Sequence, residues 1–169
     1  MVKRNREVKR ERPERPIKLY TSADEYQLAK ASFNHGLYRK GIWHLRNASH
    51  GGHVLSQLEL GSWLEAGTSS VLSDVNEALY WYSQAAQSGN DFALFRLGLC
   101  YYHGIGTLRD MKTAIEFFSY TSYLDAKFLL AVCFAKGTFK DPNACLYWCN
   151  YAAKRGHAQG NFYLKYLLN

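Results

Sequence analysis

The chain has 169 residues, of which 47% are apolar and 15% aromatic, which is typical of one folded domain and unlike a disordered chain. Its net charge of +7 is concentrated at one end. Residues 1–18 carry eight Lys or Arg and three Glu, whereas the other residues carry 13 basic and 11 acidic side chains. No apolar run approaches the roughly 18 residues that cross a bilayer, and no secretory leader is recognisable. We therefore expect an intracellular protein, cytoplasmic or organellar (mitochondria included), that is neither secreted nor inserted in a membrane.

Residues 1–18 are expected to form a flexible basic arm ahead of a helical-repeat domain that spans residues 19–169. Pro13 and Pro16 favour extended backbone in the arm. The sequence leaves open whether the arm contacts RNA phosphates, contacts an acidic protein surface, acts as a nuclear import signal or is a solvated tail. The residues that would make phosphate or acidic-surface contacts are Lys3, Arg4, Arg6, Lys9, Arg10, Arg12, Arg15 and Lys18.

Nine helices are predicted from residue 22 onward, because apolar residues recur at helical spacing between glycines and capping residues. Asp74 and Glu77 have the spacing of a capping box, and Pro142 after Asp141 suits the first position of a helix. The expected helices are Asp24–His35, Arg39–His50, His53–Ala66, 74–87, Asp91–His103, 110–122, Asp125–Lys136, 141–156 and Gln159–Leu168.

A two-helix unit returns along the chain with a period in the mid-thirties. Gly61 is followed by Gly98 after 37 residues, by Ala131 after another 33 and by Lys165 after another 34. A period of this length is typical of stacked helix pairs. The register also predicts that the second helix of the third pair is about three residues short.

The recurring small residues predict close packing within each pair. Each of the small residues in the first helices has a small counterpart in the second helix. The aromatic pair that follows is expected to fill the gap between neighbouring pairs. The small counterparts are Ala78, Ala114 and Cys145, and the aromatic pairs are Trp81-Tyr82 and Phe117-Phe118.

The stretch from Leu97-Gly98 through Tyr101, Gly104 and Gly106 to Asp110 and Ala114 resembles the Sel-one-like repeat, a relative of the tetratricopeptide repeat. The endings 81–90 and 152–158 resemble the second helix of the same repeat. The resemblance extends over residues 53–169 and is weaker over 22–52. It implies an all-α, right-handed solenoid of about four antiparallel helix pairs with a C-terminal capping helix.

The motifs that could indicate catalysis or metal binding are better explained as turns, helix caps and core residues. Gly104-Ile105-Gly106 is a repeat turn rather than a phosphate loop, and the aspartates before helices are caps. Cys145 and Cys149 suit core packing better than a metal site. The sequence does not decide whether Cys133 and Cys145 form a disulfide. We expect no enzyme, cofactor, metal or small-molecule substrate.

Two features exceed what the repeat needs, namely the basic arm and a surplus of tyrosines, which are enriched at protein interfaces. In solenoids the first helix of each pair lines the concave face. The candidate residues there are Leu94, Arg96, Tyr102 and Lys127. The resemblance implies a non-catalytic adaptor that binds proteins within a larger complex. The alternative is a structural subunit of a ribosome-like ribonucleoprotein whose arm contacts RNA.

Overall fold

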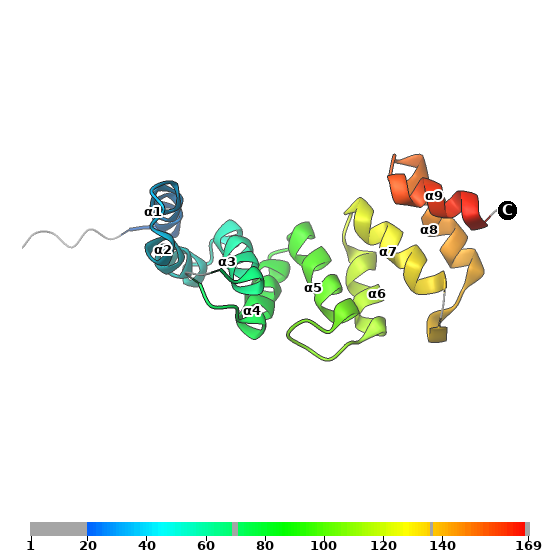
Figure 1. Ribbon diagram of the computed structural model, residues 1–169, viewed down its shortest axis with the longest axis horizontal. Coiled ribbons are helices and arrows are strands. Elements are labelled where there is room, and N and C mark those ends of the chain that lie inside the picture. Colours follow the sequence, from blue (N-terminus) through cyan, green and yellow to red (C-terminus); the bar gives the residue numbers. More distant parts are fainter. Residues whose placement is uncertain (1–19, 69–70, 136, 168–169) are drawn as a thin grey trace, which may run out of the picture.

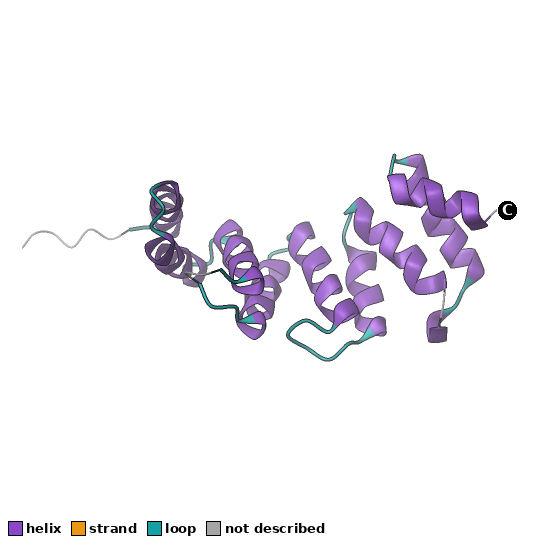
Figure 2. Cartoon of the chain, in the orientation of Figure 1, coloured by secondary structure: helices purple, strands orange, loops and turns teal. Residues whose placement is uncertain are grey.

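The structure, a computed structural model, describes residues 20–68, 71–135 and 137–167. Within these residues the secondary structure is helical, apart from one isolated bridge between Thr68 and Val71 in a loop (Figure 2). The helices are α1 (Ser22–Asn34), α2 (Tyr38–His50), α3 (Val54–Ala66), α4 (Val75–Gln87), α5 (Asp91–His103), α6 (Met111–Tyr120), α7 (Leu124–Ala135), the 3-10 turn η1 (Gly137–Phe139), α8 (Pro142–Lys154) and α9 (Ala158–Leu167).

The helices form antiparallel pairs that follow one another along the long axis of the molecule (Figure 1). The pairs are α1/α2, α3/α4, α5/α6 and α7/α8, and each second helix packs on the first helix of the next pair. α9 packs on α8 and covers the end of the row, where Tyr163 and Leu164 contact the core around Cys145 and Cys149. The expected all-α solenoid with a capping helix is therefore confirmed.

The helix starts follow local capping chemistry. α1 begins at Ser22, earlier than the expected Asp24, because Thr21 and Asp24 form a capping box in which each side chain accepts the other residue's backbone N–H, at 3.2 and 2.9 Å. Asp74 also caps its helix, accepting from the backbone N–H of Glu77 at 2.9 Å. The Glu77 carboxylate does not return to the cap, because it binds Arg46 of the preceding pair.

The recurring spacing of small residues has a more specific cause than expected. An added Cβ at Gly61 would lie 2.7 Å from the ring of Tyr82, and one at Gly98 would lie 2.5 Å from Cδ1 of the Phe118 ring. Each glycine therefore makes room for an aromatic ring from the second helix of its own pair. In the α7/α8 pair the two positions hold Ala131 and Cys149, so a larger first residue faces a smaller second one.

The two members of each aromatic pair have different roles, which corrects the expectation that both fill the gap between pairs. Tyr82 and Phe118 are fully buried within their own pairs. Trp81 reaches the preceding pair, where its ring lies 5.0 Å from that of His50. Phe117 stacks on Tyr101 of its own pair at 5.6 Å. Trp81 therefore contacts the preceding pair, whereas Tyr82 packs against the glycine of its own pair and contacts Arg96 of the next one.

Polar contacts join successive pairs at a separation close to one repeat. The Tyr26 hydroxyl donates to Glu59 at 2.6 Å, and Arg46 makes two hydrogen bonds to Glu77, 31 residues further on. His157, which also caps α9 through its Nδ1, contacts Asp125 through its Nε2 at 3.1 Å. These contacts fix the stacking of each pair on the next.

The four cysteines are free and buried, so the bridge between Cys133 and Cys145 does not form in this structure. No helix among the described residues is long and apolar enough to cross a bilayer. α6 has 10 residues whereas α4 has 13, which confirms the expected shortening of the third pair.

Candidate protein-binding site

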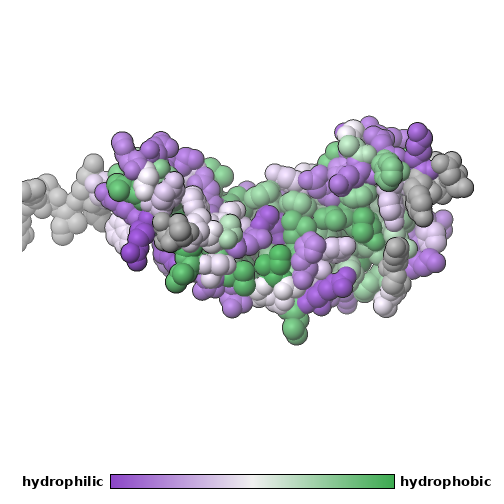
Figure 3. All heavy atoms as spheres, in the orientation of Figure 1, coloured by the Kyte–Doolittle hydropathy of each residue, from purple (hydrophilic) through white to green (hydrophobic). Residues whose placement is uncertain are grey.

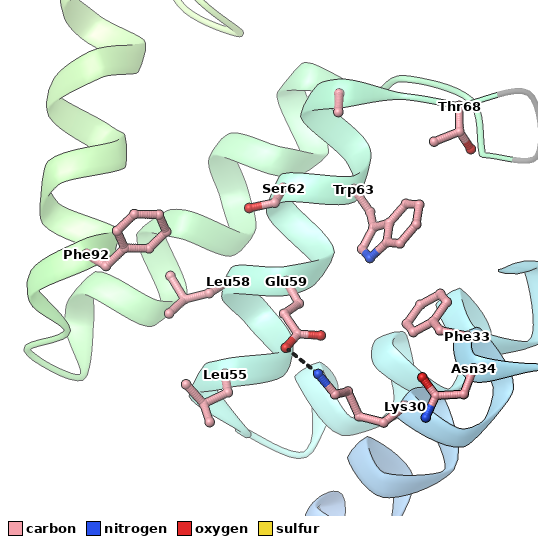
Figure 4. A pocket seen from close by; sticks show the side chains of 11 residues that line it. Lys30, Phe33, Asn34, Leu55, Leu58, Glu59, Ser62, Trp63, Thr68 and Phe92 are labelled. Carbon is pink, nitrogen blue, oxygen red and sulfur yellow. Dashed lines mark ion pairs between the residues drawn. The ribbon is translucent and has the colours of Figure 1, made fainter.

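A cleft of about 590 Å³ opens on the face formed by the first helices of the pairs, which we call the first-helix face. It lies between α1, α3 and α5, and its side chains converge from all three helices (Figure 4). The lining residues are Lys30, Phe33, Asn34, Leu55, Leu58, Glu59, Ser62, Trp63, Ala66, Thr68 and Phe92.

The wall of the cleft is aromatic and partly exposed. Phe33 from α1 stacks on Trp63 from α3, with ring centroids 5.0 Å apart and an angle of 13° between the planes. Tyr38, at the start of α2, lies 5.9 Å from Trp63 and 6.3 Å from Phe33, so the three rings form one cluster. Leu55 is 53% exposed and lines the cleft together with Phe92 of α5, on the side away from Trp63 in Figure 4. Such a wall suits an apolar side chain of a partner.

One ion pair crosses the cleft. Lys30 Nζ of α1 lies 3.7 Å from Glu59 Oε1 of α3 (Figure 4). The same carboxylate accepts the Tyr26 hydroxyl, and this hydrogen bond, with burial, raises the pKa of Tyr26 to about 12. Glu59 is therefore held in place, whereas the half-exposed Lys30 can exchange its partner at little cost.

Three of the residues predicted from the sequence lie on α5, and none of them lines the cleft. Arg96 donates to Glu65 and its guanidinium lies 5.3 Å from the ring of Tyr82, so it links α5 to the α3/α4 pair. Leu94 is half-buried. Tyr102 lines a separate hollow beside Arg109, at the far end of α5.

The fourth predicted residue, Lys127, has a structural contact. Its ammonium donates to the backbone oxygens of Phe118 and Ser119 at 3.1 and 2.8 Å, at the end of the short α6. Its side chain is 7% exposed. Gln57, which holds the equivalent position in α3, makes the same kind of bond to the carbonyl of Ser49 at the end of α2. A polar side chain at this repeat position thus caps the preceding helix. Leu94 holds the same position in α5 but has no side-chain donor for such a bond.

The eight basic residues of the arm lie outside the described residues, so the structure does not place them. Among the described residues no group of three or more His, Cys, Asp or Glu is arranged to hold a metal ion.

Sequence reasoning missed the cleft. Part of its wall comes from the helix pair that the repeat pattern covers least well, since Lys30, Phe33 and Asn34 belong to α1. One signal was available: Leu55 and Phe92 are 37 residues apart, one repeat, and both are large apolar residues in the first turn of a first helix.

Solved structures of other proteins share this architecture. A Sel1 repeat protein from Oxalobacter formigenes is similar with a TM-score of 0.76 and 22% identity over 85% of this chain and 62% of that one. The protein c5321, a protective antigen of uropathogenic Escherichia coli with an SLR fold, is similar with a TM-score of 0.78 and 26% identity over 86% of this chain and 33% of that one. The chain thus spans less than two thirds of either relative. No curated protein matches it.

The model of the Sel1 repeat matches residues 54–90, 91–122 and 124–157, which are the pairs α3/α4, α5/α6 and α7/α8. Proteins with this repeat generally mediate protein–protein interactions. With three consecutive repeats in register and the same solenoid fold, the chain belongs to the Sel1 repeat family.

Proposed function

We propose that the protein is a non-catalytic adaptor in a larger complex and that it holds a protein partner on its first-helix face. The cleft between α1, α3 and α5 is the observation that supports this most strongly. It combines an aromatic wall with one exchangeable ion pair, which is the composition of an interface anchor rather than of a catalytic centre. Arg96 follows Phe92 one turn further along α5 and would extend the contact beyond the cleft.

The proposal predicts that changes in the cleft remove the partner without unfolding the protein. Leu55 is half-exposed, so Leu55→Arg adds a charge at the mouth of the cleft and leaves the core intact. Tyr147→Arg is the matched control, because Tyr147 is 60% exposed on the second helix α8. Affinity purification from cells should recover the partner with wild type and Tyr147→Arg but not with Leu55→Arg. Equal recovery with all three would refute the proposal.

The alternative function, a ribonucleoprotein subunit, rests on the basic arm alone. Eight Lys or Arg within residues 1–18 suit phosphate contacts whose strength falls steeply with salt. The two functions are separable, because removing residues 1–18 should abolish RNA retention and leave the contact through the cleft unchanged.

A further inference from the structure

The loops that connect the two helices within each pair share an unusual feature. Each exposes one large apolar side chain. Leu72 is 90% exposed and Leu108 is 87% exposed, whereas Leu37 and Phe139 are 51% and 36% exposed. Three of the four stand at one repeat position, two residues before the aspartate that caps the second helix, and Leu37 takes the capping position itself in the shortest loop. Single exposed leucines are ordinary, but a row in register is not.

Folding does not require these side chains. In the α3/α4 loop the neighbouring Val71 is buried and anchors the loop. In the α5/α6 loop Ile105 packs against the core while Leu108 projects from the surface. The loops of α3/α4, α5/α6 and α7/α8 lie along the lower edge in Figure 1, and apolar atoms protrude over the α5/α6 loop at this edge in Figure 3. We call the row Leu37, Leu72, Leu108 and Phe139 the loop edge.

A hollow of about 490 Å³ lies between two of these loops. It is lined by Tyr102, Arg109, Met111, Val132, Cys133, Thr138 and Phe139. Its walls are mostly apolar, so the loop edge offers both protruding side chains and a recess that can take one from a partner.

One residue that lines the hollow, Arg109, is cationic, and Lys112 and Lys140 directly follow the lining residues Met111 and Phe139 in the chain. Arg109 is held there by a hydrogen bond that its Nε donates to the carbonyl of Tyr102 at 3.1 Å, and its guanidinium lies 5.9 Å from the Tyr102 ring. Arg109, Lys112 and Lys140 are exposed, and none of them forms an ion pair within the described residues. An exposed arginine that lines an apolar recess, with two more exposed cations next to it in sequence, favours an acidic partner.

The two nearby carboxylates are already engaged. Asp110 accepts from the backbone N–H groups of Lys112 and Thr113 and from the Thr113 hydroxyl, and these bonds lower the pKa of its carboxyl. Asp141 caps α8 in the same way, at 2.9 and 3.0 Å. The positive ends of α6 and α8 partly offset both charges, so they oppose an incoming carboxylate less than free aspartates would.

From this arrangement we propose that the loop edge is a second protein-binding site, distinct from the cleft, for an acidic segment that places a Leu or Phe in the hollow and carboxylates on Arg109, Lys112 and Lys140. The protruding Leu72 and Leu108 extend the contact along the edge. The site does not depend on the first-helix face and stands if the cleft proves not to bind.

The test uses the full chain and short fluorescein-labelled peptides in which Leu and Phe are flanked by Glu. Fluorescence anisotropy should show binding that weakens with added salt. The wild-type affinity should fall by about tenfold or more in Leu108→Ser and in Arg109→Glu. Leu55→Ser, in the cleft, is the matched control and should bind as wild type does. Circular dichroism verifies that each variant is folded.

Several outcomes would overturn the proposal. One is the absence of binding up to about 1 mM protein. Equal binding of matched peptides with Lys in place of Glu, or with Ala in place of Leu and Phe, would also contradict it. Loss of binding in Leu55→Ser but not in Leu108→Ser would assign the peptide to the cleft. If wild type sediments as a dimer and Leu108→Ser as a monomer, the loop edge joins two copies of this chain instead. Binding to anionic vesicles in place of the peptides would identify a lipid surface.

Discussion

Substitution of Gly98 by alanine tests the packing rule inside the helix pairs. The new methyl group would lie 2.5 Å from Cδ1 of the buried Phe118 ring, so either the ring or the helices must move. Overpacking of this kind costs about 1–3 kcal/mol, and the better helix propensity of alanine returns about 1 kcal/mol. We expect the free energy of unfolding to fall by about 2 kcal/mol, at the upper end of the difference between these two terms, because the ring is fully buried and has no free side to move toward.

The rule also predicts the sign of the same substitution in a second background. Phe118→Cys copies the α7/α8 pair, where Ala131 faces Cys149, and it alone should cost about 3–5 kcal/mol through the cavity it leaves. In that background Gly98→Ala should be neutral or stabilising, which gives a favourable coupling of about 2–3 kcal/mol. Urea unfolding followed by circular dichroism measures all four proteins. If Gly98→Ala costs the same with and without the ring, the glycine is not there to make room for it.

Three further predictions concern other parts of the chain. Lys127→Met should destabilise the protein by about 1–3 kcal/mol, because two α6 carbonyls lose their donor, and urea unfolding would show this. Burial lowers the pKa of Lys127, so between that lowered value and about 10.4 the unfolded chain binds more protons than the folded one. The free energy of unfolding of wild type, relative to that of Lys127→Met, should therefore rise with pH across this window. A fall with pH would contradict the assignment. Burial raises the pKa of Cys100 and Cys133 to about 11 and that of Cys149 to about 12, so native thiols should react slowly with a disulfide reagent at about pH 8 and rapidly in urea, whereas fast native reaction would refute their burial. Deletion of residues 1–18 should remove salt-sensitive RNA retention in a filter-binding assay, and unchanged retention would exclude the arm as an RNA contact.

The order of the helices was predictable because each repeat carries its own stop and start signals. Gly89 and Gly104 have positive φ angles of 73° and 76° at helix ends, and Asp74, Asp110 and Asp141 cap the helices that follow. These signals act within a few residues, so a single sequence reveals them.

The binding surfaces were less predictable, because they depend on contacts between repeats. The side chain of Lys127 resembles a surface cation in the sequence, and its inward contact with the Phe118 carbonyl depends on how α7 packs against the end of α6. Trp63 and Phe33 form one wall although they lie on different helix pairs. Stacking geometry of this kind is set by the whole solenoid and not by any one helix.

The central claim is that a protein partner occupies the cleft on the first-helix face. The most direct measurement is photo-crosslinking in cells with benzoylphenylalanine in place of Leu55, compared with the same group in place of Tyr147 on α8. We predict one discrete adduct from the cleft position that Lys30→Glu diminishes, and none from the control position. No adduct at position 55, or the same adduct from both positions, would contradict the claim.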